Sequence, residues 1–388
     1  MLWTVVFNCI PVLAWAVAVC SALLPMKLGR LPTLLLSLVL GAAFCKFGFF
    51  AIVGGDSFNP QLPQQVVLAY GVAYGAAMLL AFFSCIAVCV EFALSIAGRA
   101  PGVRARRIRT AVLAVFSAAL AAWGVYEGIR VPPVKRVEIA FESLPACFDG
   151  YRIVHLSDLH CSPAARKARF ERIVDRVNTL DADMIAITGD FVDGTVAERG
   201  GDMAPLGRLR ARDAVLGCTG NHEAYWEWDR WLPVFRRFGI VFPEETGAVA
   251  VHRESGALAV GAVPDPAISA SATGDASVWP AGGIDGCFDG TPPDAFRILL
   301  FHRPLADSAG VGPGCSGVRL QLSGHTHGGA MPLVRWLVAR ANEGRVRGLY
   351  EFAPGRFIHV SPGTGQWAGF PLRILNPAEI TLIVLRKA

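Results

Sequence analysis

The sequence predicts an N-terminal region of four transmembrane helices followed by a layered α/β domain. Residues 1–129 of the 388-residue chain are almost entirely apolar, whereas the remainder alternates short apolar strands with amphipathic helices. A chain of this length is also too long for one ordinary compact domain. We therefore expect a transmembrane region at 1–129 and a folded domain at 137–388. A stiff linker at 130–136, which contains Pro132 and Pro133, joins them.

Four apolar runs define the first part, at residues 2–24, 31–53, 66–96 and 110–125. The first three exceed the ~17 residues that cross a hydrocarbon core as a helix, and the fourth is close to that length. Buried helices of a soluble protein rarely form such a series. A cleaved signal peptide is also disfavoured, because no basic residue precedes the first run and further runs follow it. We expect a multi-pass integral membrane protein in which Lys46 extends to an interface.

The distribution of basic residues predicts the orientation of these spans. Lys27 and Arg30 lie between the first two runs, five arginines lie between the last two, and Asp56 is the only charge between the second and third. Loops rich in Lys and Arg stay in the cytoplasm. The C-terminal domain is therefore expected on the extracytoplasmic side of the cytoplasmic (plasma) membrane. The formal charge of +5 does not predict nucleic-acid binding, because arginines in a short loop between spans form no soluble basic face.

In the second part, apolar runs and helical periodicity predict an α/β order. Phe170, Ile173, Val174, Val177 and Leu180 recur on one helical face, and a second helix is expected at 226–238. Residues 264–293 are rich in Gly, Ala, Ser, Asp and Pro and are expected to form a surface excursion. The expected strands lie at 151–156, 184–188, 214–218, 249–252, 258–263, 297–301, 319–322, 357–360 and 380–385.

The ten cysteines contain no CxxC pair, so a structural zinc site is not expected. In an oxidising compartment a disulfide such as Cys287 to Cys315 is one option. The sequence does not assign the pairing.

Five polar motifs follow expected strands in one order along the chain. They are Ser157-Asp158-Leu159-His160, Gly189-Asp190-Phe191-Val192-Asp193, Gly220-Asn221-His222-Glu223, Phe301-His302-Arg303-Pro304 and Gly324-His325-Thr326-His327-Gly328. In open α/β sheets, such side chains gather in the crevice outside the carboxyl ends of the strands. Asp158 and His160 can point at one ion, and the two oxygens of Asp190 can bridge two ions. Oxygen and imidazole ligands without thiolate suit Mn, Fe or Zn.

This ordered set of motifs resembles the calcineurin-like metallophosphoesterases, over residues 137–385. The resemblance implies a β-sandwich flanked by helices, with two divalent metal ions at its edge. By position, one ion would bind Asp158, His160, Asp190 and His327, and the other would bind Asp190, Asn221, His302 and His325. The apolar spans and the closing stretch 365–380 look like the membrane-bound branch. Gly194-Thr195 stands where soluble protein phosphatases of the family carry Arg-Gly, which argues against a phosphoprotein phosphatase.

These residues lead to a functional hypothesis. Two metal ions activate water for attack on phosphorus, His222 is the candidate general acid, and Asp193 would orient it. We expect hydrolysis of a phosphomonoester, phosphodiester or pyrophosphate, with a lipid-linked phosphate at the membrane surface as one substrate. Two alternatives stay open, namely a membrane-anchored enzyme for soluble nucleotides or phosphoproteins and a non-catalytic sensor or transporter. The sequence does not indicate the oligomeric state.

Overall fold

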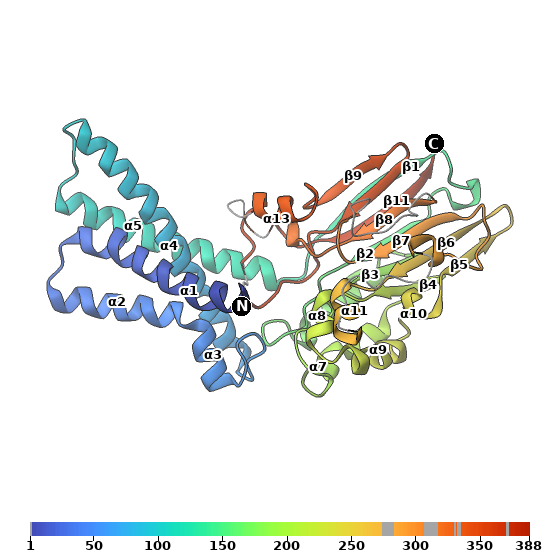
Figure 1. Cartoon of the computed structure of the whole chain (residues 1–388), viewed down its shortest axis with the longest axis horizontal. Helices are drawn as coiled ribbons and strands as arrows, with labels where there is room; N and C mark the ends of the chain where they lie inside the picture. Colours follow the sequence, from blue (N-terminus) through green and yellow to red (C-terminus); the bar gives the residue numbers. More distant parts are fainter. Residues whose placement is uncertain (1, 274–282, 306–316, 330, 332–334, 370–371) are drawn as a thin grey trace. The chain divides into compact units, whose positions relative to one another are not determined.

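The computed structural model describes residues 2–273, 283–305, 317–329, 331, 335–369 and 372–388, and the chain divides into two compact units (Figure 1). The first unit contains Met1–Glu127 together with Ala368–Leu372. The second contains Gly128–Trp367 and Arg373–Ala388. A short stretch near the C-terminus thus belongs with the apolar helices rather than with the α/β domain that surrounds it in the sequence.

The first unit is helical, with three helices among the described residues that are long and apolar enough to cross a membrane, or four spans if a bent pair counts as one. Helix α1 (Leu2–Ala18) continues through the π turn η1 (Val19–Leu23) and the 3₁₀ turn η2 (Leu24–Met26). The bent pair is α2 (Arg30–Phe44) and α3 (Lys46–Gly54), which meet at 63°. The unit also contains α4 (Gln64–Ile96) and α5 (Val103–Ile129). Helix α5 is longer than the expected 110–125, because its arginine-rich start is itself helical and Arg is a good helix former.

Lys46 does not extend to an interface, contrary to the prediction. Its side chain is buried, and its Nζ donates hydrogen bonds to the carbonyl oxygens of Ala368 at 2.9 Å and Gly369 at 3.1 Å. The same Nζ lies 4.9 Å from the ring centroid of Phe47 and 5.6 Å from that of Tyr74. A buried ammonium group needs acceptors and aromatic faces of this kind, since desolvation alone is very costly.

The second unit contains two mixed sheets. The first has the strand order β1-β11-β2-β3-β4. Strands β2, β3 and β4 run parallel, while β11 is antiparallel to β2 and parallel to β1. Strand β1 was not predicted, because its first three residues were assigned to the linker and its charged residues give little apolar pattern. It is built as an edge strand beside β11. The bounds are β1 (Val134–Phe141), β2 (Arg152–Leu156), β3 (Met184–Thr188), β4 (Ala214–Cys218) and β11 (Ile380–Lys387).

The second sheet has the order β5-β6-β7-β8-β10-β9. Strands β6, β7, β8 and β10 run parallel, and the two edge strands are antiparallel to their neighbours. Of these strands only the edge strand β9, whose residues are all at least partly exposed, was not predicted from the sequence. The bounds are β5 (Val249–Arg253), β6 (Gly256–Val263), β7 (Phe296–Phe301), β8 (Val318–Ser323), β9 (Gly348–Ala353) and β10 (Arg356–Val360).

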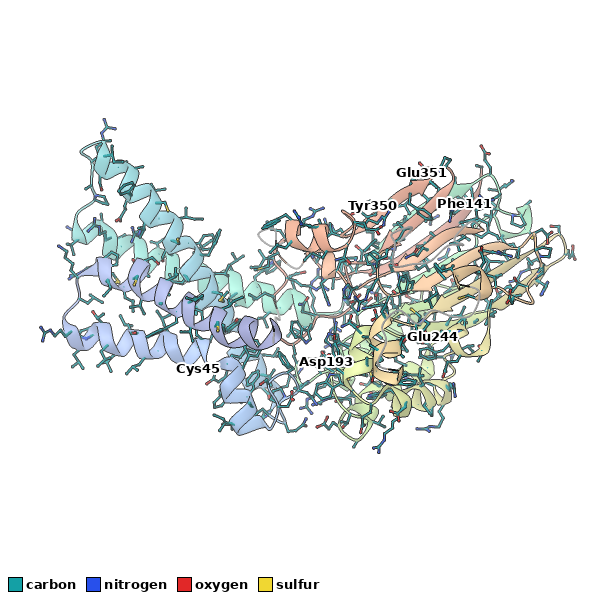
Figure 2. The ribbon with its side chains drawn as sticks, in the orientation of Figure 1. Cys45, Phe141, Asp193, Glu244, Tyr350 and Glu351 are labelled. Atoms are coloured by element: carbon teal, nitrogen blue, oxygen red, sulfur yellow. The ribbon has the colours of Figure 1, made fainter. Side chains whose placement is uncertain are left out.

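The two sheets pack face to face through one apolar cluster, so the expected sandwich is confirmed. Phe141 on β1 (Figure 2) spans the interface, with its ring centroid 4.8 Å from that of Phe296 on β7 and 5.4 Å from that of Phe357 on β10. Aromatic pairs in such edge-to-face geometry add to the gain from burial.

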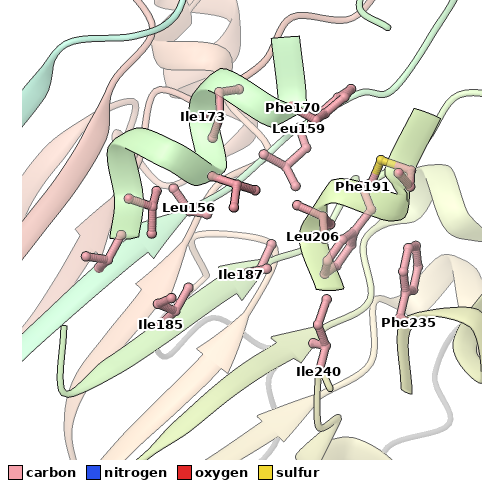
Figure 3. Packing of buried hydrophobic residues seen from close by; sticks show 14 of the residues in the cluster. Leu156, Leu159, Phe170, Ile173, Ile185, Ile187, Phe191, Leu206, Phe235 and Ile240 are labelled. Carbon is pink, nitrogen blue, oxygen red and sulfur yellow. The ribbon is translucent and has the colours of Figure 1, made fainter. Parts of the chain in front are cut away.

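Helices cover the outer face of the first sheet, as predicted for a flanked sandwich. The apolar faces of α6 (Lys167–Asn178), α7 (Val196–Met203) and α9 (Trp228–Arg237) close over it. Figure 3 shows this layer, which contains Phe170 and Ile173 of α6 together with the strand residues Ile185 and Ile187. The second sheet has a smaller outer cluster that includes Ile284 of α12 (Gly283–Gly286). The short helix α11 (Pro266–Thr273) lies within the stretch expected to be a surface excursion.

Candidate metal centre

All nine predicted site residues lie where parallel strands end. Asp158 and His160 follow β2, and Asp190 and Asp193 follow β3. Asn221 and His222 begin the short helix α8 (Asn221–Tyr225) after β4. In the second sheet, His302 follows β7, and His325 and His327 follow β8. The carboxyl ends of both sets of parallel strands therefore contribute to a single edge of the sandwich.

Side-chain atoms of these loops converge to hydrogen-bond distance. Nε2 of His160 lies 3.1 Å from Nε2 of His327, and Nδ1 of His325 lies 3.2 Å from Nε2 of His302. Oδ2 of Asp190 is 3.3 Å from Nε2 of His302 and 3.7 Å from Nε2 of His160. Asp190 thus faces both histidine pairs.

The described residues form three groups with the chemistry and spacing of metal ligands, and the ligand atoms of each group lie within 4.8 Å of one another. The groups are Asp158, His160 and His327; Asp190, His302 and His325; and His160, Asp193 and His222. Oδ1 of Asn221 is buried and has no hydrogen-bond partner among the described residues. Imidazole nitrogens that face one another at 3.1 and 3.2 Å, beside an amide oxygen with no partner among these residues, form an arrangement that a cation would satisfy.

The charges of the cluster also fit a cation. Burial and the neighbouring His302 lower the pKa of His325 to about 3, so this ring is neutral and able to ligate. Burial alone would lower the pKa of His302, but the carboxylate of Asp190 outweighs it and raises the pKa to about 10. The site therefore favours a positive charge beside Asp190, and a metal ion bound there would take the place of the His302 proton.

Five of these residues hold the backbone in the left-handed region that non-glycine residues rarely adopt. Their φ angles are 51° at Asp158, 46° at His160, 54° at Asp190, 69° at His325 and 46° at His327. Such conformations cost energy and persist where the surrounding structure fixes them, as it does at functional sites.

Two glycines of the motifs let the loops approach this closely. A Cβ on Gly220 would overlap the carboxylate and backbone of Asp190, and one on Gly324 would overlap Ser157 and Asp158. The glycines flanking the His-x-His and Asn-His pairs are therefore required by close packing between the motifs.

His222 and Asp193 form a close pair that adjoins His160 of this cluster. Nδ1 of His222 lies 2.5 Å from Oδ1 of Asp193, which is also 3.3 Å from Nδ1 of His160. Burial alone would lower the pKa of His222, but Asp190 and Asp193 outweigh it and raise the pKa to about 9. Burial would raise the pKa of Asp193, but His160 and His222 lower it to about 2. The pair is therefore a protonated imidazole held by a carboxylate (Asp193, Figure 2).

Glu223 is a structural residue of the site that the sequence analysis quoted only as part of a motif. Its buried carboxylate accepts hydrogen bonds from the backbone N–H groups of Asp190 at 3.0 Å, Phe191 at 2.7 Å and Gly220 at 2.7 Å. It therefore ties the loop after β3 to the loop after β4. Burial, followed by the charge of Asp190, raises its pKa to about 7.

Other residues noted in the sequence have ordinary structural roles. His155 on β2 and His359 on β10 are buried with their Nδ1 atoms 3.0 Å apart, which fits packing between the sheets, and His252 is exposed. Arg303 is held by the buried Asp265 through hydrogen bonds of 2.7 and 2.9 Å. Cys315, one end of the suggested disulfide, lies outside the described residues.

Comparison with known proteins agrees with this geometry. Residues 151–329, which carry all the motifs, match the sequence model described as "Calcineurin-like phosphoesterase". The chain is 32% identical to a "Transmembrane protein with metallophosphoesterase domain" of Bos taurus, over 89% of this chain and 79% of that protein. The chain belongs to the calcineurin-like phosphoesterase family.

Two further relatives of the family are similar to this chain. A Danio rerio protein of the same description is 30% identical, over 94% of this chain and 82% of its own length. An "Uncharacterized metallophosphoesterase" of Helicobacter pylori is 30% identical over 68% of this chain and 66% of its own length. With the His and Asp clusters, family membership makes this calcineurin-like phosphoesterase a metal-dependent phosphoester hydrolase with N-terminal apolar helices.

Proposed function

We propose that this phosphoesterase is a multi-pass membrane enzyme that hydrolyses the phosphate ester of a lipid-linked substrate outside the cytoplasm. The observation that supports it is the placement of the His222–Asp193 pair beside two groups of metal-ligand type that both lie close to Asp190, in a chain that also contains apolar helices. Such a centre suits monoesters, diesters and pyrophosphates alike. We propose Ile129 as the end of the anchor and Val134 as the start of the catalyst, since a boundary at 137 would divide strand β1.

The residues have distinct roles in this proposal. Asp158, His160, Asp190 and His327 would hold one divalent ion, and Asp190, Asn221, His302 and His325 the other. Two such ions, when bound, neutralise phosphoryl oxygens and activate water. His222 is the proton donor to the leaving oxygen, and Asp193 keeps its ring protonated and oriented. Manganese, iron and zinc all suit this set of nitrogen and oxygen ligands.

The test is a substrate panel with the full chain, purified in detergent and supplied with Mn²⁺, Fe²⁺ or Zn²⁺. Hydrolysis of bis-p-nitrophenyl phosphate measures basal activity. Phosphomonoesters, nucleotides, phosphopeptides and phospholipids in mixed micelles are then added as competing substrates. We expect kcat/KM for a phospholipid to exceed that for every soluble ester by about tenfold or more, since substrate and enzyme share the membrane. Higher values for nucleotides or phosphopeptides would replace this proposal with the soluble-substrate alternative.

The proposed orientation has its own test. Reporter fusions at Ala388, read with a probe active only outside the cytoplasm and another active only inside, should place the C-terminus outside. The basic start of α5, which contains Arg104 and Arg107, should be reached only from inside. A cytoplasmic C-terminus would contradict the orientation.

A further inference from the structure

A pocket of about 300 Å³ opens beside the metal centre in the second unit. Its lining begins at Gly328, the residue after His327. The polar groups of this lining are two guanidinium groups and one amide, and none of the lining residues is acidic. The lining consists of Gly328, Met331, Arg335, Arg347, Leu375 and Asn376.

Asn376 connects this pocket to the metal centre. Its Nδ2 donates a hydrogen bond to the carbonyl oxygen of His327, and its Oδ1 accepts one from Nη1 of Arg347 at 2.9 Å. Gly328, with φ of 60°, lies so close that a Cβ there would overlap the Asn376 amide. The pocket is therefore fixed relative to His327, and one ligand could reach both sites.

The two arginines give the pocket its charge. Arg335 begins α13 (Arg335–Ala341), and its side chain packs against Gly329 in the loop that carries His327. Arg335 and Arg347 are both exposed, which leaves their guanidinium groups accessible to a ligand. A guanidinium group binds phosphate through two parallel hydrogen bonds, so two of them favour an anionic group such as phosphate over a neutral or cationic ligand.

Apolar side chains surround the same region. Leu375 is 81% exposed and has a φ of 56°, an unfavourable backbone conformation for a leucine. Trp336 and Leu337 on α13 are 62% and 50% exposed. An exposed apolar group in a strained conformation beside a cationic pocket matches a ligand that is itself amphiphilic.

From these contacts we infer that the pocket binds a second phosphate group of a lipid substrate, while the ester of that lipid is hydrolysed at the metal centre. The lipid chains lie over Leu375, Trp336 and Leu337. This inference rests on the proposed function and narrows its substrate to lipids that carry two phosphates.

The experiment compares two lipids in mixed micelles with the full chain. Phosphatidylglycerol phosphate carries two phosphates, and phosphatidic acid carries one. Arg335→Ala and Arg347→Ala should raise KM for the first lipid about tenfold more than KM for the second, because only the first loses a charged contact. Arg340→Ala, on the same helix and exposed but outside the pocket, is the matched control and should change neither by more than about twofold.

A second pair of variants separates a lipid from a soluble diphosphate. Leu375→Gly removes the apolar group and suits the positive φ, so folding should be retained. Leu375→Gly and Trp336→Ala should each raise KM for both lipids. Neither variant should change inhibition by inorganic pyrophosphate relative to the parent chain. If pyrophosphate inhibition depends on the arginines while the lipid KM is insensitive to Leu375 and Trp336, the ligand is soluble and the lipid inference is wrong.

The inference and the proposed function fail in different ways. Equal KM changes for the two lipids, or the same change in Arg340→Ala, would exclude the second phosphate site even in an active enzyme. Micelle binding by Asp190→Asn protein reads the pocket without turnover. Suppose that Asp190→Asn protein binds the micelles, that adding Arg335→Ala abolishes this binding, and that the parent chain hydrolyses none of the panel. The phosphate pocket would then be supported and the proposed function refuted.

Discussion

Oδ1 of Asp193 lies 2.5 Å from Nδ1 of His222, while Nε2 of the same ring lies 4.0 Å from Oδ2 of Asp190. The ring thus presents one nitrogen to an orienting carboxylate and the other to the metal cluster. Asp193 and His222 come from loops after different strands, so this relationship exists only in the folded sandwich.

The first prediction concerns proton donation. His222→Ala should retain both metals but lower kcat on an alkyl phosphate by about 10²–10⁴-fold, the range of general acid catalysis. The loss of kcat should be far smaller on a p-nitrophenyl ester, because p-nitrophenolate leaves without needing a proton. Metal analysis and kcat on both esters are the measurements, and equal losses would refute the acid role.

Asp190→Asn tests the shared carboxylate. An amide cannot supply two anionic oxygens to neighbouring cations, and Asp190 faces both histidine pairs. We expect loss of at least one equivalent of metal and turnover near background. Glu227→Gln, at a half-buried carboxylate that pairs with Arg230 away from the cluster, is the control. Retained activity and metal in Asp190→Asn would contradict the shared-ligand arrangement.

Glu223→Gln tests the link between the loops. The amide can accept through one oxygen but turns its NH₂ toward a backbone N–H that now needs an acceptor. We expect metal affinity to fall about 10–100-fold, as for other groups that orient metal ligands through hydrogen bonds. The midpoint of thermal unfolding should also fall. Metal titration by calorimetry measures the first effect. An unchanged affinity would mean that Asp190 holds its position without Glu223.

Lys46→Met tests the buried ammonium group of the first unit. Two carbonyl groups, of Ala368 and Gly369, lose their donor, at a cost on the order of 1–3 kcal/mol each. The full chain in detergent should therefore unfold at a lower temperature, and Lys46→Arg should restore part of the difference. Lys27→Met, which removes an exposed lysine from a loop, should have little effect. Equal midpoints for Lys46→Met and the parent chain would show that these hydrogen bonds contribute nothing to stability.

Much of the fold could be read from local patterns. The sequence analysis predicted Met184–Thr188 and Ala214–Cys218 with the bounds that the structure has, because short apolar runs bounded by glycine or polar residues are typical of buried parallel strands. The edge strands β1 and β9 were not predicted, since edge strands pair through the backbone on one side only and keep exposed residues; β1 also carries three charged side chains.

The sequence alone determined the apolar helices, the order of the motifs and the residue types of a metal centre, because periodicity and motif spacing are local properties of the chain. Tertiary structure decided that Asp190 faces both histidine pairs, that Glu223 ties two loops together, that Lys46 donates to carbonyl groups some 320 residues away, and that Arg335 and Arg347 share a pocket. Those relationships join residues that are distant in the chain, and they arise only when sheet pairing and burial bring the strand ends together.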